Sequence, residues 1–172
     1  MELAVSRNIF LTGFMGAGKS TVGRLLANLM NRPFVDLDEM IVQRENRTIA
    51  DIFAAEGEKY FRDCETSVLN ELYQQPVAIY ATGGGIVVRD ENRRTMKGIG
   101  SIVYLKTNWT TLKNRLRKSV DRPLVDPDAG WDHVKALLAD RQTFYEDADI
   151  VVETDGCTPS QVAHKIASGL ML

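Results

Sequence analysis

The sequence predicts an α/β fold in which a mostly parallel sheet is covered by helices on both faces. Short apolar runs alternate along the 172 residues with segments of helical periodicity. Several of these runs end in glycines or carboxylates, which is typical of strands that lead into a ligand site. The length fits one domain, and the 44% hydrophobic and 26% charged residues are ordinary for a globular protein.

The first strand, about 8–11, leads into Gly13-Phe14-Met15-Gly16-Ala17-Gly18-Lys19-Ser20 and then into a helical pattern. A strand that is followed by the pattern G-x-x-x-x-G-K-S and then by a helix indicates a phosphate-binding loop. Its glycines let backbone N–H groups turn toward phosphates, and the helix N-terminus adds to their field. Lys19 would reach the β- and γ-phosphates, and the Ser20 hydroxyl would ligate Mg²⁺. The alternative is a glycine-rich turn without a ligand.

The helix after this loop has apolar residues at i, i+3, i+4 and i+7, namely Val22, Leu25, Leu26 and Leu29. This spacing predicts one buried stripe. A short second strand then ends in Asp36-Leu37-Asp38, at the edge where open parallel sheets bind ligands. In an extended chain the two carboxylates would share a face, one for hydrated Mg²⁺ and one for an acceptor hydroxyl. A solvated turn is the alternative.

Residues from about 39 to 74 have helical spacing that is interrupted at Gly57. Thr48 followed by Asp51 resembles a capping box, which predicts a helix start there. The insert is too large for a simple crossover between strands. We therefore interpret residues of about 36–74 as a helical, substrate-binding subdomain of a single domain that spans residues 1–172.

The third strand, 77–81, runs directly into Thr82-Gly83-Gly84-Gly85. Three ordered glycines cost roughly 1 kcal/mol each relative to alanine, which favours close backbone approach to a ligand over a plain turn. Further along we expect helices at 89–96, 109–116 and 131–145 and strands at 101–105 and 149–152. Thr158-Pro159 is typical of the start of a last helix.

Three arginines are candidates for binding anionic groups. Arg122 lies in a segment of about 117–130 that is rich in prolines and charges and is expected to form a mobile lid over the phosphates. Arg62 and Arg141 each lie near aromatic residues in a helical pattern, and together they could bind a carboxylate through bidentate hydrogen bonds. An exposed basic side chain is the alternative for each of them.

Composition argues against several partners. The net charge of −2 gives no electrostatic reason to expect nucleic acid or an anionic membrane as a partner. No apolar stretch has the length of about 20 residues that a membrane helix needs. The N-terminal residues lack the pattern of a secretion signal, and Cys64 and Cys157 lie far apart in the sequence, so we expect reduced thiols and a cytoplasmic protein.

Taken together, several segments resemble the shikimate kinase family. The shared segments are the phosphate-binding loop, Asp36-Leu37-Asp38, Ile52-Phe53…Gly57-Glu58…Phe61-Arg62, Thr82-Gly83-Gly84-Gly85, Arg122-Pro123-Leu124 and Arg141…Tyr145, in this order along nearly the whole chain. The resemblance implies a three-layer, nucleoside-monophosphate-kinase-like P-loop fold with a five-stranded parallel sheet of order 2-3-1-4-5. It also implies Mg²⁺- and ATP-dependent phosphorylation of shikimate at its 3-hydroxyl, in chorismate and aromatic amino-acid biosynthesis.

The resemblance also implies a role for each matching residue. The nucleotide would be bound by Gly13, Gly16, Ala17, Gly18, Lys19, Ser20, Thr21, Arg115 and Arg122, with Ser20 and Asp36 on the Mg²⁺. Shikimate would be bound by Asp38, Phe53, Phe61, Arg62, Gly83, Gly84, Gly85 and Arg141. Lys19, Asp38 and Arg122 would act in catalysis. Arg115 would flank adenine opposite the segment before Pro159, although Arg117 or Lys118 could take its place. We expect a monomer.

Other functions remain as alternatives. A gluconate kinase would also bind a carboxylate and hydroxyls, but the triglycine and Phe-Arg segments favour shikimate. A nucleoside monophosphate kinase would need a base-reading site, which nothing here resembles. A GTPase switch would show N-K-x-D and D-x-x-G, and neither motif occurs. A non-catalytic nucleotide-binding module would have lost a catalytic residue, and none is lost.

Overall fold

The computed structural model describes residues 7–118 and 130–170. In this part of the chain five strands form one parallel sheet in the order β2-β3-β1-β4-β5. The strands are β1 (Asn8–Thr12), β2 (Phe34–Asp36), β3 (Ile79–Ala81), β4 (Gly100–Lys106) and β5 (Ile150–Glu153). The predicted sheet and its order are confirmed.

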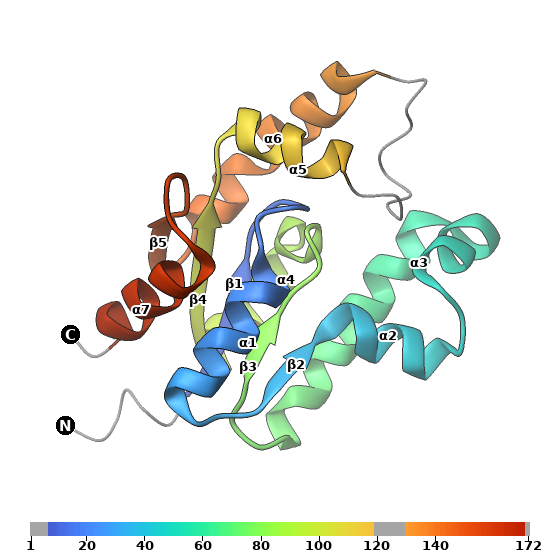
Figure 1. The fold of residues 1–172 in the computed structure, drawn as a ribbon. Coiled ribbons are helices and arrows are strands. Elements are labelled where there is room, and N and C mark those ends of the chain that lie inside the picture. The colour runs from blue at the N-terminus through green and yellow to red at the C-terminus, as the bar shows by residue number, and fades with distance from the viewer. Residues whose placement is uncertain (1–6, 119–129, 171–172) are drawn as a thin grey trace.

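Helices cover both faces of the sheet (Figure 1). They are α1 (Lys19–Met30), α2 (Leu37–Glu45), α3 (Ile49–Glu71), α4 (Asp90–Ile99), α5 (Trp109–Arg117), α6 (Trp131–Glu146) and α7 (Pro159–Leu170), with short 3₁₀ turns η1 (Leu72–Gln74) and η2 (Ile86–Val88). In Figure 1, α1 and α7 lie in front of the sheet, α4 lies behind it, and α2 and α3 gather beside the edge strand β2. The sheet is thus the middle of three layers.

The central strand β1 is buried along its whole length. It pairs with β3 on one side and β4 on the other, so that Leu11 is flanked by Ala81 and Val103. Phe10 stacks on Tyr80 with ring centroids 5.2 Å apart. Because all the strands are parallel, the loops after β1, β2 and β3 leave the sheet at one edge, which is where a ligand site is expected.

The prediction that four apolar residues of α1 form one buried stripe is wrong for two of them. Val22 and Leu26 are buried, but Leu25 and Leu29 are 38% and 45% exposed. The helix approaches the sheet through Gly23, where a Cβ atom would overlap the Phe34 ring. This close approach turns the face with Gly23 and Ala27 toward the sheet and leaves the other leucines at the surface.

The helical insert has the predicted start and break. The Thr48 side chain accepts a hydrogen bond from the Asp51 amide at 3.1 Å and caps α3, and Gly57 interrupts that helix with a φ of 82°. The extended geometry predicted for Asp36-Leu37-Asp38 is wrong, because β2 ends at Asp36 and α2 begins at Leu37. Asp36 instead caps α2, and its side chain accepts from the Asp38 amide.

Two further observations bear on the sequence-based expectations. Within residues 7–118 and 130–170, the structure has no helix with the length and apolar character needed to cross a bilayer. Cys64 and Cys157 are both free thiols.

Candidate active site

A cavity of about 1200 Å³ opens where the loops after β1, β2 and β3 leave the sheet. Most of the predicted site residues line it: Gly16, Ala17, Gly18, Lys19, Ser20, Thr21, Asp36, Asp38, Phe53, Phe61, Arg62, Gly83, Gly84, Gly85, Arg115 and Arg141. Gly13 begins the loop that forms its floor. Arg122 lies outside the described residues. The phosphate-binding loop and the two predicted carboxylate-binding arginines therefore share one cavity.

The loop between β1 and α1 is shaped by its glycines. Gly13 has a φ of 145°, and a Cβ atom there would lie 2.9 Å from the Leu105 carbonyl oxygen. The Lys19 ammonium donates to the Gly13 and Phe14 carbonyl oxygens at 2.8 and 3.0 Å. The loop therefore curls around the Lys19 side chain at the N-terminus of α1, where backbone N–H groups favour an anion.

Ser20 and Asp36 meet beside this loop. The Ser20 hydroxyl donates to Asp36 Oδ2 at 2.7 Å, while Asp36 Oδ1 accepts from the Asp38 amide at 3.0 Å. The cap at the start of α2 thus fixes the Asp36 carboxylate against the first turn of α1. A hydroxyl and a carboxylate are the hard oxygen ligands that Mg²⁺ prefers, and Mg²⁺ sites with phosphates use only one or two protein ligands. This pair fits the predicted ion.

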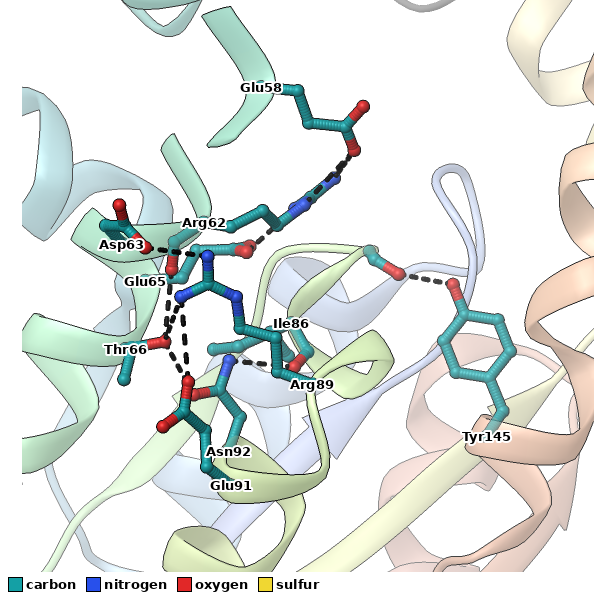
Figure 2. A network of polar contacts seen from close by, with 11 residues as sticks. Glu58, Arg62, Asp63, Glu65, Thr66, Ile86, Arg89, Glu91, Asn92 and Tyr145 are labelled. Carbon is teal, nitrogen blue, oxygen red and sulfur yellow. Dashed lines mark hydrogen bonds and ion pairs between the residues drawn. The ribbon is translucent and has the colours of Figure 1, made fainter. Parts of the chain in front are cut away.

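The cavity lining also includes a buried ion pair on α3. Arg62 Nη1 donates to Glu65 Oε2 at 2.7 Å, and Arg62 Nη2 donates to Glu58 Oε1 at 2.9 Å (Figure 2). Burial opposes the charge on Arg62, but the Glu65 and Glu58 carboxylates outweigh it and raise the pKa of the guanidinium. Arg62 therefore stays charged in the wall and can bind an anion.

Glu65 is a residue that the sequence reasoning missed. It is only 1% exposed, and its second oxygen, Oε1, has no hydrogen-bond partner among the described residues. Burial raises the pKa of Glu65 to about 7, although the nearby Arg62 opposes this shift. The available signal was a carboxylate three residues after Arg62, on a helix face that Phe61, Val68 and Leu69 mark as apolar.

The triglycine turn leaves space for these side chains. A Cβ atom at Gly83 would lie 2.6 Å from Glu65 Oε1 and 2.8 Å from Asp38 Oδ1, and one at Gly85 would overlap the Arg62 guanidinium. The Tyr145 hydroxyl donates to the Gly84 carbonyl oxygen (Figure 2). Burial raises the pKa of Tyr145, which keeps this hydroxyl protonated as a donor. The close approach of charged side chains thus explains why two of the three positions, 83 and 85, are glycine.

The other residues predicted to bind the acceptor come from α3 and α6. Arg141, on α6, is 5% exposed and lies one helical turn before Tyr145. Phe53 and Phe61 lie on either side of the break in α3, with ring centroids 4.9 Å apart, and both line the cavity. Charged groups and an aromatic wall therefore surround the same space.

The end of the cavity formed by the phosphate-binding loop extends to α5 and α7. Arg115 Nη1 donates to the Gly16 carbonyl oxygen at 3.0 Å, and Thr154, Cys157 and Pro159 line the cavity with it. The alternative Arg117 lies instead over the Trp131 ring, 5.7 Å from its centroid. Of the two, Arg115 is the one that faces the cavity, and its place beside adenine stays a prediction.

A phosphate-binding loop on a 2-3-1-4-5 sheet, facing an acid and two arginines across one cavity, defines a P-loop kinase that acts on a small molecule. The chain belongs to the shikimate kinase family, whose family model matches residues 15–170. It is 39% identical to the shikimate kinase of Geobacter metallireducens over 164 residues, which are 95% of this chain and 92% of that one. The shikimate kinase of Legionella pneumophila is 41% identical over 167 residues, 96% of this chain and 95% of its own.

Solved structures agree with this assignment. The structure of a shikimate kinase from Acinetobacter baumannii in complex with shikimate has a TM-score of 0.91 and 38% identity, covering 96% of this chain and 93% of that one. A gluconokinase from Sinorhizobium meliloti has a TM-score of 0.61 at 16% identity, covering 97% of this chain and 93% of its own. That likeness extends to the fold alone.

Proposed function

We propose that this protein transfers the γ-phosphoryl group of ATP to the 3-hydroxyl of shikimate, giving shikimate 3-phosphate and ADP. The single observation that supports the proposal is the shared cavity, which is lined by Lys19 and the phosphate-binding loop and also by Arg62 and Arg141. The product would enter chorismate and aromatic amino-acid biosynthesis. We further propose a monomer in the cytoplasm.

At the nucleotide end, the loop from Gly13 to Thr21 would bind the phosphates through its amides and Lys19. Ser20 and Asp36 would hold Mg²⁺, which when bound offsets charge on the β- and γ-phosphates. Arg115 would cover one face of adenine, with the segment before Pro159 on the other. Arg122 would add positive charge from a lid formed by residues of about 117–130.

At the acceptor end, Arg62 and Arg141 would bind the shikimate carboxylate from two directions. The turn from Gly83 to Gly85 would present its backbone to the ring, and Phe53 with Phe61 would form the apolar wall. Residues of about 36–74 would thus act as the substrate-binding subdomain. The buried Glu65 would hold the Arg62 guanidinium in place, since it accepts one of its hydrogen bonds.

The chemical step would be an in-line displacement at the γ-phosphorus. The acceptor oxygen forms the new P–O bond while the bond to the β-phosphate oxygen breaks, and the hydroxyl proton passes to the Asp38 carboxylate. Phosphoryl transfer depends on positioning, which Asp38 would supply for the hydroxyl, and on stabilisation of charge, which Lys19 would supply for the phosphates. Closure of the cavity would exclude water as a competing acceptor.

A coupled assay of ADP release from Mg-ATP tests the proposal. We expect rapid turnover with shikimate and negligible turnover with gluconate, AMP or CMP. Gluconate is the informative control, because it also offers a carboxylate and hydroxyls on a similar fold. Preference for any of these three acceptors over shikimate would overturn the proposal.

A further inference from the structure

Asn92, on α4, is a buried amide that does not line the cavity. It is 1% exposed and makes two hydrogen bonds with its side chain (Figure 2). Its oxygen accepts from the Thr66 hydroxyl at 2.9 Å, and its Nδ2 donates to the Ile86 carbonyl oxygen at 3.0 Å. Thr66 belongs to α3 and Ile86 begins η2, so one amide joins two separate elements behind the active site.

The hydrogen bonds determine which way this amide points. The Ile86 carbonyl can only accept, so the NH₂ group must face it and the oxygen must face Thr66. Arg89 Nη1 donates to the Thr66 hydroxyl oxygen at 3.1 Å, so the hydroxyl hydrogen is directed to an acceptor, with Asn92 Oδ1 at 2.9 Å and the Arg62 carbonyl oxygen at 3.1 Å. Arg89 also pairs with Asp63 on α3 at 2.7 Å. The bridge is therefore directional, and its Thr66 end is supported from the surface.

The two elements that the amide joins carry the acceptor site. Thr66 lies one helical turn after Arg62, and Ile86 directly follows Gly85. The Arg62 guanidinium packs against Gly85 so closely that a Cβ atom would overlap it, and Glu65 lies against Gly83. A small change in the separation of α3 and the triglycine turn would therefore displace both members of the buried ion pair.

We propose that Asn92 is a positioning residue for the acceptor site. It holds the triglycine turn at the distance from α3 at which Arg62 and Glu65 are aligned for a carboxylate-bearing acceptor. It acts through Thr66 and Ile86 and touches no substrate. The proposal rests on the proposed function, because the site that it aligns is the shikimate site.

Asn92→Asp gives the sharpest test, since it keeps the shape but places a carboxylate oxygen against the Ile86 carbonyl. We expect the KM for shikimate to rise about tenfold or more, the size of one lost buried hydrogen bond. The KM for ATP should stay within about twofold, because Asn92 bonds to α3 and to Ile86, whereas Lys19 is held by carbonyl oxygens of its own loop.

Thr66 offers a second and milder pair of variants. Thr66→Val removes the hydroxyl at nearly constant volume and should raise the KM for shikimate several-fold. Thr66→Ser keeps the hydroxyl and should retain a KM close to that of the unchanged chain. This pair keeps the test decisive even if Asn92→Asp fails to fold.

Asn8→Ala is the matched control. Asn8 is also a buried asparagine, 5% exposed, and its oxygen accepts from the Ala78 amide at 3.1 Å, but it lies at the opposite end of β1 from the site. We expect it to lower stability and leave both KM values unchanged. If the Asn92 and Thr66 variants behave in this way too, the positioning role is wrong. Absence of shikimate turnover by the unchanged chain would instead refute the proposed function, and the positioning role with it.

Discussion

The two ends of the cavity are built in different ways. The end that we propose for the nucleotide is centred on one continuous segment, Gly13 to Ser20, in which Lys19 donates to carbonyl oxygens of its own loop. The acceptor end combines side chains from α2, α3 and α6 with the turn after β3. Its charged residues are also deeper, with Arg62 at 8%, Arg141 at 5% and Glu65 at 1% exposure.

This difference has an energetic consequence. Charges near the surface are solvated whether or not they have a partner, whereas buried charges depend on the groups that face them. Substitutions at the nucleotide end should therefore change activity with little effect on stability. Substitutions at the acceptor end should change both, because the buried Arg62 and Glu65 are ion-pair partners of each other.

The largest effect should come from Asp38→Asn. The amide keeps the shape of the side chain but cannot take the hydroxyl proton, so kcat should fall by about 10³-fold. Affinity for ATP, measured by calorimetry, should stay within about twofold. A kcat close to that of the unchanged protein would remove Asp38 from the chemical step.

Arg62→Ala should have the next largest effect and should distinguish the two ends. Loss of a charged hydrogen-bond donor to the acceptor should raise the KM for shikimate by about 10²-fold. The same change leaves Glu65 buried without its partner, so the free energy of unfolding should fall by about 3 kcal/mol.

A second substitution separates these two effects. In the double variant Arg62→Met, Glu65→Gln the buried charge is gone, and denaturant unfolding should show that part of the stability returns. The KM for shikimate should remain high. If stability does not change in either variant, the buried ion pair is not what makes the acceptor end sensitive.

The same contrast explains what could be predicted from sequence. The phosphate-binding loop is local, so its spacing alone indicates its structure and its ligand. The start of α3 at Thr48 and its break at Gly57 are local signals too. The sheet order depends on tertiary pairing and was predicted only through the resemblance to a family.

The failures share a physical cause, which is contact between segments distant in sequence. Leu25 and Leu29 fit a helical stripe, but close packing at Gly23 turns the buried face away from them. Glu65 lies on a helix face that its local sequence marks as apolar, whereas the burial of Asn92 depends on contacts with Thr66 and Ile86 in other elements.

The pH dependence of stability should sharpen the comparison further. The pKa of Glu65 is about 7 in the folded protein, above its ordinary value of 4.5. Between these values the folded state keeps a proton that the unfolded chain releases, so stability should fall as pH rises from about 4.5 to 7. The slope for one proton is at most about 1.4 kcal/mol per pH unit.

Glu65→Gln should remove this contribution. Urea unfolding at several pH values from 5 to 8 would give the free energy of unfolding of both proteins as a function of pH. The contribution of Glu65 is the difference between the two slopes, since other groups titrate equally in both. Ser20→Ala, at the nucleotide end, serves as a control and should keep the original slope. Equal slopes for Glu65→Gln and the unchanged protein would mean that Glu65 is ionised throughout this range.

The smallest effect should come from Arg115→Ala. Arg115 is exposed and makes its hydrogen bond to Gly16 at the surface, where water can replace it. We expect the KM for ATP to rise about fivefold, with stability within about 0.5 kcal/mol of that of the unchanged protein and the KM for shikimate unaltered. Arg117→Ala is the matched control, because Arg117 lies on the same helix but over Trp131. An equal rise in both variants would mean that α5 contributes general positive charge rather than a specific contact.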